Sequence, residues 1–198
     1  MGKVNKVRAA LLILTVFFIV SSCFQLFSQV HRLKFNYLSL EHGLSQNSVY
    51  SICQDSKGFM WFGTEDGLNR YDGYDVSVFR HSQDDPGSLL GSVVYSICED
   101  HEAVLWIGTS GGLNKFNGDT GTFSHYRHEP ANPNSLGHNG VNAVRESSRH
   151  PGILWIGTGG GGLNRMNPPG SKEGRFTIYT TKDGLSNDIV NSVFEDSG

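Results

Sequence analysis

Three tryptophans, Trp61, Trp106 and Trp155, have the type and spacing that could support recognition chemistry in this 198-residue chain. An exposed indole ring can stack on the apolar face of a sugar. Each of these tryptophans instead occupies the same slot of a recurring Trp-Φ-Gly-Thr sequence, where Φ is Phe or Ile, with apolar flanks. We therefore expect the three rings to pack in the core between neighbouring sheets.

Residues 157–162, Gly-Thr-Gly-Gly-Gly-Gly, formally satisfy the dinucleotide-binding pattern G-x-G-x-x-G. That function requires a helix directly after the glycines, but Leu-Asn-Arg-Met-Asn-Pro-Pro follows and cannot start a useful helix. The same slot reads Gly-Thr-Glu-Asp-Gly at 63–67 and Gly-Thr-Ser-Gly-Gly at 108–112. The pattern therefore predicts a tight turn, with no cofactor and no cofactor-binding residue.

No catalytic or metal-binding constellation is predicted. His125 and His128 are the only close pair among the histidines, and no Glu or Cys completes a metal-ligand spacing around them. The turn at 55–58 lacks the ligand density of a calcium loop, and no serine stands in a Gly-x-Ser-x-Gly elbow. We expect no catalytic residue, no metal site and no enzyme activity in this chain; the activity of a longer protein stays open.

Cys53 and Cys98 lie 45 residues apart, in the same slot of successive repeats. Equivalent points on packed sheets stand about 10 Å apart, beyond the roughly 7 Å that a disulfide spans. We predict two free, structural thiols.

The tryptophans lie 45 and 49 residues apart, a period that indicates a β-propeller. Within the first repeat, apolar runs at 49–54, 59–64, 68–71 and 74–80 predict four strands, and Asp72-Gly73 predicts the last hairpin turn. The expected fold is all-β, with four-stranded antiparallel blades and one tryptophan on an inner strand of each. Gly63, Gly108 and Gly157 mark the same slot in every repeat, and the Asn-Arg or Asn-Lys pair after each Gly-Leu predicts a solvated strand edge.

Blade repeats are expected at about 43–81, 88–126 and 135–179, with a partial fourth at 184–198. Residues 33–40 parallel the stretch before the fourth repeat and predict the outer strand of a further blade. Because a propeller typically needs four to eight blades, we expect a truncated, N-terminal part of a longer protein with an incomplete ring.

Residues 1–28 predict an export signal. Lys3, Lys6 and Arg8 precede a 12-residue apolar run at 9–20, within the length of a signal-peptide core. Three readings stay open: cleavage after Ser28, a lipobox at 20–23 that leaves Cys23 lipidated, or an uncleaved anchor over 9–27. Each places residues 29–198, the propeller repeats, in the periplasm or cell envelope.

The charge argues against nucleic-acid binding. The formal net charge is -3, and three of the 16 basic residues belong to the export segment, so the repeats are more acidic still. A basic footprint for DNA or RNA is missing.

The repeat over Asn47 to Arg70 reads Asn-x-Val-x-x-Ile-x-x-Asp-x-x-Gly-x-x-Trp-Φ-Gly-Thr-x-x-Gly-Leu-Asn-Arg, and Gly-Leu-Ser lead-ins stand at 43–45 and 184–186. This pattern resembles the two-component regulator propeller family over residues 33–198. Two departures, His-Glu-Ala at 101–103 in place of Ser-Lys-Gly and an insertion at 149–152, leave the shapes of those turns open.

The resemblance implies the periplasmic sensor region of a hybrid two-component histidine kinase. Members typically continue through one or two seven-bladed propellers, a small β-sandwich, a membrane helix and a cytoplasmic histidine kinase; others end in a diguanylate cyclase. Many sense glycan fragments. Their ligand contacts vary, so no ligand residue is carried over.

We therefore expect an extracytoplasmic ligand-sensing region of a two-component signalling protein. The alternative is a secreted or lipid-anchored binding propeller without kinase output, and lipidation of Cys23 would discriminate between the two. Expected partners are a small extracellular ligand such as a carbohydrate, the membrane through the N-terminus or a missing C-terminal part, and a second copy in a full-length homodimer.

Overall fold

The computed structural model describes residues 8, 12–18, 35–168 and 175–196, and the chain divides into two units, residues 1–37 and 38–198. In the first unit, residues 12–18 are helical. Among the described residues, no helix combines the length and the apolar character that a membrane crossing requires. Cys23 and most of the predicted export segment lie outside the described residues.

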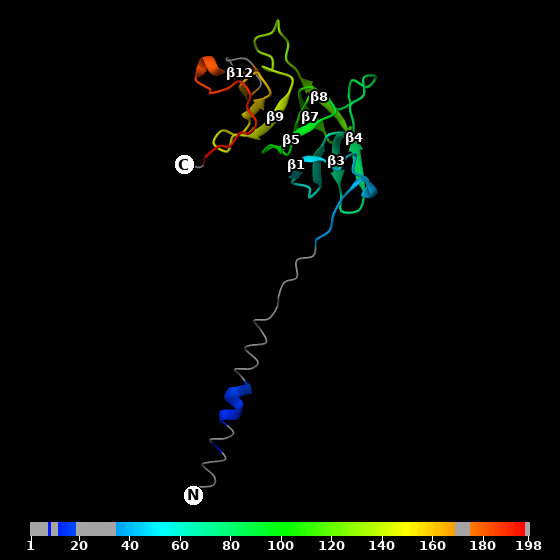
Figure 1. Ribbon diagram of the computed structural model, residues 1–198, viewed down its shortest axis with the longest axis vertical. Coiled ribbons are helices and arrows are strands. Elements are labelled where there is room, and N and C mark those ends of the chain that lie inside the picture. Colours follow the sequence, from blue (N-terminus) through cyan, green and yellow to red (C-terminus); the bar gives the residue numbers. More distant parts are fainter. Residues whose placement is uncertain (1–7, 9–11, 19–34, 169–174, 197–198) are drawn as a thin grey trace. The chain divides into compact units, whose positions relative to one another are not determined.

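The second unit consists of three four-stranded antiparallel sheets, each with its strands in chain order (Figure 1). The first sheet contains β1 (Val49–Gln54), β2 (Met60–Thr64), β3 (Gly67–Tyr71) and β4 (Val76–Phe79). The second contains β5 (Val94–Glu99), β6 (Leu105–Thr109), β7 (Leu113–Asn117) and β8 (Thr122–Tyr126). The third contains β9 (Val141–Glu146), β10 (Leu154–Thr158), β11 (Leu163–Met166) and β12 (Phe176–Tyr179). The all-β, blade-like architecture predicted from the period is confirmed.

The first strands of the three blades lie side by side. β5 contacts both β1 and β9, and Figure 1 shows the three strands in succession. Each of them is a terminal strand of its sheet, paired on one edge only. We call the unpaired edge of β1, β5 and β9 the inner edge.

Two short 3-10 helices, η1 (Leu40–His42) and η2 (Thr181–Asp183), precede the Gly-Leu-Ser lead-ins. Each ends at a glycine in the left-handed region, Gly43 at φ 98° and Gly184 at φ 104°. The outer strand predicted over 33–40 is not formed within described residues 35–39, where Phe35 is 86% exposed. A strand needs a hydrogen-bonded partner, and the blade to which this strand would belong has no other strand among the described residues, so the prediction stays open.

Residues 184–196, the fourth segment, lie against the third blade. Gly159 and Ile189 form an isolated antiparallel bridge, and the Val190 N–H donates to the Thr158 carbonyl at 2.9 Å. No strand is assigned within this segment, so the predicted fourth repeat is present as a docked extended chain.

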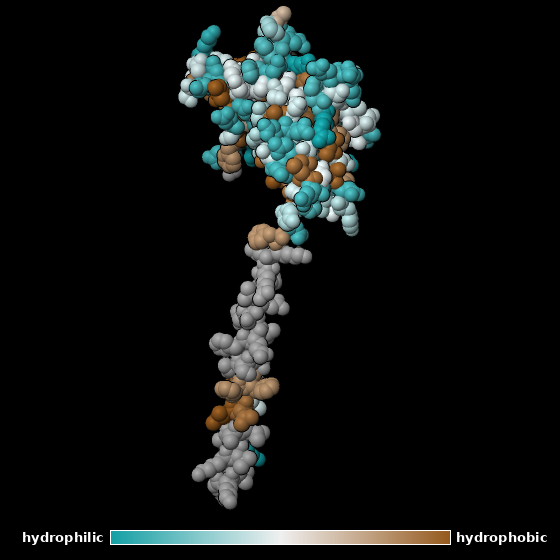
Figure 2. All heavy atoms as spheres, turned by 45° about the vertical axis from the view of Figure 1, so that its right-hand side comes forward, coloured by the Kyte–Doolittle hydropathy of each residue, from teal (hydrophilic) through white to brown (hydrophobic). Residues whose placement is uncertain are grey.

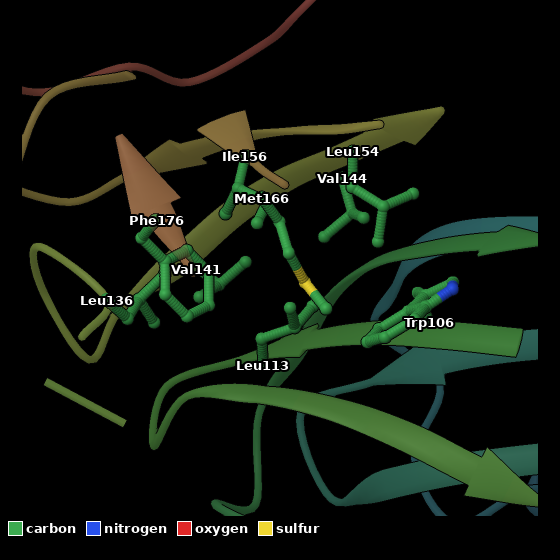
Figure 3. Close-up of a cluster of buried hydrophobic side chains, with 9 residues drawn as sticks. All are labelled: Trp106, Leu113, Leu136, Val141, Val144, Leu154, Ile156, Met166 and Phe176. Atoms are coloured by element: carbon green, nitrogen blue, oxygen red, sulfur yellow. The ribbon is translucent and has the colours of Figure 1, made fainter. Parts of the chain in front are cut away.

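The core is divided between the two blade-to-blade spaces. One cluster joins the first and second blades, and the other joins the second and third. In Figure 3, Trp106 and Leu113 of the second blade face Leu154, Met166 and Phe176 of the third. Burial of apolar area therefore stabilises each blade mainly through its neighbours.

The surface of the second unit is mostly polar on the face in Figure 2, where teal and white residues predominate and brown ones form small groups. Among the exposed large apolar side chains, three belong to β1: Val49, Tyr50 and Ile52. This face of the first blade has no blade packed on it within the described residues.

Candidate functional site

The glycine of each Trp-Φ-Gly-Thr sequence lies where the next blade approaches most closely. A Cβ at Gly63 would stand 2.6 Å from Val94 Cγ1, and one at Gly108 would stand 2.6 Å from Val141 Cγ1. A Cβ at Gly157 would stand 2.8 Å from the carbonyl oxygen of Val190. Because only glycine lacks this atom, it permits the first strand of the following repeat to pack against the second strand of its predecessor.

Two of the three tryptophans are buried between blades. Trp61 is 2% exposed and its indole N–H donates to Asp55 Oδ2 at 2.7 Å; Trp106 is 5% exposed and donates to Asp100 Oδ2 at the same distance. Neither ring offers a free face to a sugar. The aspartate that directly follows the first strand of the first two blades therefore satisfies a buried donor, a role that the sequence analysis missed.

Trp155 is only partly buried. Its ring lies 6.1 Å from that of Tyr179, and it lines a hollow together with Val193 and Phe194 of the fourth segment. The slot of the aspartate is here occupied by Ser147, which donates to Glu195 Oε1 at 2.8 Å. The third tryptophan thus packs against the chain that begins the next repeat.

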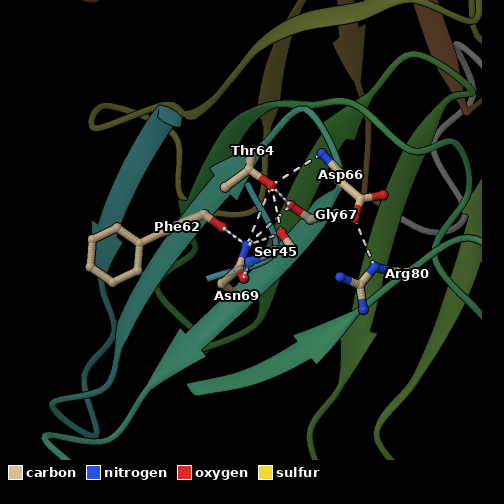
Figure 4. A network of polar contacts seen from close by, with 7 residues as sticks. All are labelled: Ser45, Phe62, Thr64, Asp66, Gly67, Asn69 and Arg80. Carbon is tan, nitrogen blue, oxygen red and sulfur yellow. Dashed lines mark hydrogen bonds and ion pairs between the residues drawn. The ribbon is translucent and has the colours of Figure 1, made fainter. Parts of the chain in front are cut away.

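The asparagine of each Gly-Leu-Asn sequence is buried, so the prediction of a solvated strand edge is wrong. In Figure 4, Asn69 Oδ1 accepts from the Ser45 N–H at 2.8 Å, and Nδ2 donates to the Ser45 hydroxyl at 2.9 Å. Asn114 and Asn164 likewise accept from the backbone N–H groups of Leu90 and Gly137, both at 2.7 Å. The lead-in loop of each blade covers this position, which the local pattern does not reveal.

The basic residue that follows the asparagine lies over aromatic rings. The Arg70 guanidinium carbon is 4.9 Å from the centroid of Phe59 and 5.9 Å from that of Trp61. Lys115 Nζ is 5.6 Å from the centroid of Trp106. A cation in this position is attracted by the ring quadrupole, so these side chains belong to the contact between blades.

A carboxylate joins each blade to the one before it. Glu99 accepts from the Ser56 N–H and hydroxyl, both at 2.8 Å. Glu146 accepts from the N–H of His101 at 2.7 Å and also bonds its ring Nδ1. Glu195 accepts from the hydroxyls of Ser147 and Ser148. We call this arrangement the carboxylate clasp.

The clasps shift two pKa values in opposite directions. Hydrogen bonds from Ser148 and Ser147 lower the pKa of Glu195 to about 2. The hydrogen bond to Glu146 raises the pKa of His101 above its usual 6.5. The sequence analysis missed these residues, although Glu99, Glu146 and Glu195 recur with the repeat period.

Each first strand also carries a β-bulge at the same place. Pairing passes from Val49↔Thr64 to Ser51↔Gly63, which leaves Tyr50 without an opposite residue. The equivalent shifts leave Tyr95 in β5 and Asn142 in β9 without an opposite residue in the neighbouring strand. A bulge redirects a side chain, and no local sequence signal had singled out these three residues.

Three histidines form hydrogen bonds with the linkers between blades. Ring N–H groups of His81 and His128 donate to the carbonyls of Leu89 and Leu136, and that of His125 donates to Ser88, all at 2.8 Å. Within the described part of the chain, no group of three or more His, Cys, Asp or Glu side chains could hold a metal ion. These imidazoles therefore act as structural donors.

The two described cysteines, Cys53 and Cys98, are free thiols, as their spacing predicts. Burial raises the pKa of both, so little reactive thiolate is present near neutral pH.

The glycine run is the turn between β10 and β11, and a strand follows it. A Cβ at Gly161 would stand 2.4 Å from the carbonyl carbon of Gly137, and Gly162 has φ 70°. Close packing against the lead-in loop thus requires these glycines, and the turn predicted in place of a phosphate cradle is confirmed.

The repeats match a family of signalling propellers. A family model described as the two component regulator propeller matches residues 43–66 and 88–111. A curated relative, histidine kinase P4 of Formosa agariphila, is 47% identical over 47 residues, which are 24% of this chain and 3% of the relative.

Solved structures extend the similarity to most of the chain. The extracellular domain of a protein described as the hybrid two-component system BT3049 of B. thetaiotaomicron aligns with a TM-score of 0.70 and 33% identity, over 78% of this chain and 21% of that one. The extracellular domain of BT4673 of the same organism, described as a one-component system, aligns with a TM-score of 0.67 and 27% identity. This alignment covers 83% of this chain and 23% of that one. The chain thus spans about a fifth of the length of the structures that it matches.

The first two blades match the two component regulator propeller repeat, and the described sheets resemble the blades of two-component system proteins. The similar solved structures are extracellular domains.

Proposed function

We propose that this chain is the extracytoplasmic, ligand-sensing propeller region of a two-component signalling protein. The observation that carries the proposal is the 33% identity, over 78% of the chain, with the extracellular domain of a hybrid two-component system. The charged and apolar N-terminal segment supports delivery across the membrane. Phosphotransfer would belong to a histidine kinase region outside these blades.

The geometry supports a binding role. Several side chains that could have done chemistry are engaged in structure: Trp61 and Trp106 in blade contacts, and His81 and His128 in linkers. A rigid framework of this kind leaves its loops and edges for recognition. A ligand drives signalling only if it prefers one of two receptor arrangements, and a shift from 1:99 to 99:1 needs about 5.5 kcal/mol of differential affinity.

Location is tested with reporter fusions placed after Gly198. An enzyme that is active only outside the cytoplasmic membrane is expected to be active in the fusion, and a reporter that is active only in the cytoplasm is expected to be silent. The reverse pattern would contradict export.

Sensing is tested by deleting residues 43–198 from the full-length gene and measuring induction of the neighbouring operon by a mixture of glycan fragments. We expect induction to be lost while the membrane level of the protein is retained on an immunoblot. Unchanged, glycan-dependent induction would place sensing elsewhere.

A secreted or lipid-anchored module without kinase output is the second candidate, favoured by the Val-Ser-Ser-Cys sequence at 20–23. Cys23→Ala is expected to abolish labelling by a radioactive fatty acid if that sequence is a lipobox. Absence of label in the parent protein would exclude lipidation.

A further inference from the structure

We propose that a hollow between the first and second blades binds a small monocarboxylate with an apolar tail, and that Arg70 holds the carboxylate. The hollow has a volume of about 150 Å³ and is lined from both blades, with Phe59 and Arg70 on one side and Leu105 and Phe116 on the other. We call it the interblade hollow. This site goes beyond the proposed function, because binding there does not require that the chain signals.

The guanidinium of Arg70 is held by aromatic rings while its hydrogen-bond donors are unused. Its central carbon lies 4.9 Å from the centroid of Phe59 and 5.9 Å from that of Trp61. Among the described residues, no hydrogen bond or ion pair engages this group, and its Nε is buried without a partner. Buried polar groups without a partner are rare in folded proteins. An acceptor brought by a ligand would satisfy these donors.

Two other arginines of the blades use their donors within the chain. Arg80 Nε donates to Asp66 Oδ2 at 2.9 Å. Arg175 lies over an aromatic ring, as Arg70 does, and still donates to the Asn167 carbonyl at 3.3 Å. Stacking on a ring therefore does not prevent an arginine from finding an acceptor, and the unused donors of Arg70 need a separate explanation.

The inner carboxylates of the interblade hollow are committed to other donors. Asp55 accepts from two backbone N–H groups and from the indole of Trp61. Glu99 accepts both of the bonds that form its clasp. The third carboxylate, Asp119, is exposed and forms no ion pair with Arg70. The guanidinium therefore has no counter-ion among the described residues of this chain.

The charge and the walls of the interblade hollow select the ligand. Two cations, Arg70 and Lys57, and three carboxylates line it, so a dianion would meet a net negative charge. The planar guanidinium fork matches the two oxygens of a single carboxylate. The apolar side chains beside it, Phe59, Leu105 and Phe116, can bury a short aliphatic or aromatic tail. Butyrate and benzoate meet both conditions.

The test is isothermal titration calorimetry of the full-length protein with butyrate and benzoate. Butyramide, succinate and butylammonium are the neutral, doubly negative and positive comparators. We expect at least one of the two monocarboxylates to bind. Each comparator is expected to bind at least about tenfold more weakly, because only a monoanion forms charge-assisted bonds with the guanidinium without excess repulsion.

Three variants assign the binding to the interblade hollow. Arg70→Met keeps an apolar stem over the rings and is expected to weaken monocarboxylate binding at least about tenfold. Arg70→Lys keeps the charge without the fork, so an intermediate affinity is expected. Lys115 occupies the same slot over Trp106 in the second blade, so this variant is expected to fold. Asp119→Asn removes a negative charge from the hollow and is expected to strengthen binding at least about twofold.

Arg127→Met is the matched control, because Arg127 is exposed and lines a different hollow, beside the linker of residues 81–90. It removes the same charge and is expected to bind like the parent protein. Thermal unfolding of each variant checks that the fold is intact. If Arg70→Met does not fold, Arg70→Lys and Asp119→Asn decide, and parental affinity in both would overturn the site.

The site is wrong if neither monocarboxylate binds, if Arg70→Met binds within about twofold of the parent, or if Arg127→Met loses as much affinity as Arg70→Met. Binding of butyramide, succinate or butylammonium as tight as that of butyrate and benzoate overturns the ligand class.

Discussion

Gly108 illustrates how a single missing atom sets the distance between two blades. Its α-carbon faces Val141 of the next blade, and the same relation links Gly63 with Val94. Protein interiors are packed too densely to absorb an added methyl group without movement. The glycine of Trp-Φ-Gly-Thr is thus a spacing residue between blades as well as a member of its own strand.

Gly108→Ala is expected to lower the free energy of unfolding by about 1–3 kcal/mol, because the new Cβ meets Val141 and its carbonyl oxygen. Urea unfolding of the chain measures the change. Gly118→Ala is the control, since an added Cβ there meets only a Phe116 carbon at 3.9 Å, and it is expected to change stability by less than about 0.5 kcal/mol. Equal effects of the two substitutions would contradict the spacing role.

Ala103 shows how the turn that departs from the family pattern keeps its shape. It has φ 60°, in the left-handed region that Gly58 occupies at φ 90° in the first blade. Both residues donate their N–H to the aspartate three positions earlier, Ala103 to Asp100 and Gly58 to Asp55. The turn is therefore retained in spite of the backbone strain that alanine carries there.

Sequence patterns predicted residues whose roles are local and missed those whose partners are distant. The glycines of the tight turns could be assigned because turn geometry depends on neighbouring residues. The burial of Asn69 could not, because its partner, Ser45, is 24 positions away. The clasp of Glu99 with Ser56 spans 43 positions and depends on how two sheets meet.

At the scale of elements, the carboxylate clasps tie one blade's first turn to the next blade's first strand. They repeat in position, with different donors: Ser56, His101 and the pair Ser147 and Ser148. Because the donors differ, the contacts respond differently to pH. The lowered pKa of Glu195 and the raised pKa of His101 therefore give two of these contacts opposite pH dependences.

The contact of the fourth segment is expected to weaken in acid. The folded-state pKa of Glu195 is lowered from 4.5 to about 2, so its contribution is full above pH 4.5 and is lost as the pH falls toward 2. Hydrogen exchange at the Val190 amide, corrected for the intrinsic rate, is expected to accelerate over this range. Glu195→Gln is expected to remove most of the pH dependence; an unchanged profile in the variant would show that Glu195 is not the cause.

The contact between the second and third blades is expected to weaken in alkali instead. The pKa of His101 is raised above 6.5, so its contribution is full below pH 6.5 and is lost as the pH rises through the raised value. Comparison of urea midpoints of the parent and His101→Gln at pH 6 and pH 9 checks this sign. A larger difference at pH 9 than at pH 6 would refute it.

At the scale of the whole molecule, the face of β1 differs from the equivalent faces of β5 and β9. Val94 and Val141 are fully buried, whereas Val49 is 37% exposed and Ile52 is 62% exposed. The residues are of the same type, so the difference comes from the neighbouring blade that covers β5 and β9. An apolar strand face of this kind favours association.

Residues 29–198 produced alone are expected to self-associate through the β1 face. Light scattering over a concentration series is expected to show that the average molar mass of the protein increases with concentration. Ile52→Lys is expected to reduce this increase in molar mass. Tyr74→Lys, which replaces an exposed aromatic residue away from β1, is expected to leave it unchanged. A strictly monomeric parent would show that the exposed face does not drive association.

The overall architecture was the most predictable level, because the repeat period carries it. The strands of the first blade match the expected segments to within two residues at each end. The outer strand expected over 33–40 stays a prediction, because the blade to which it would belong has no other strand among the described residues. The bulges at Tyr50 and Tyr95 could not be predicted from the sequence, because a bulge is defined by the register between two paired strands.

The contact between Gly63 and Val94 has a direction, since one blade contributes the glycine and the other the valine. Contacts of this head-to-tail kind propagate indefinitely and close into a ring only when the rotation per unit divides a full turn. The number of blades is thus set by the angle between successive blades, while the contacting residues stay the same. A ring with one repeat more would therefore have to change that angle in order to close, even if the same residues formed each contact.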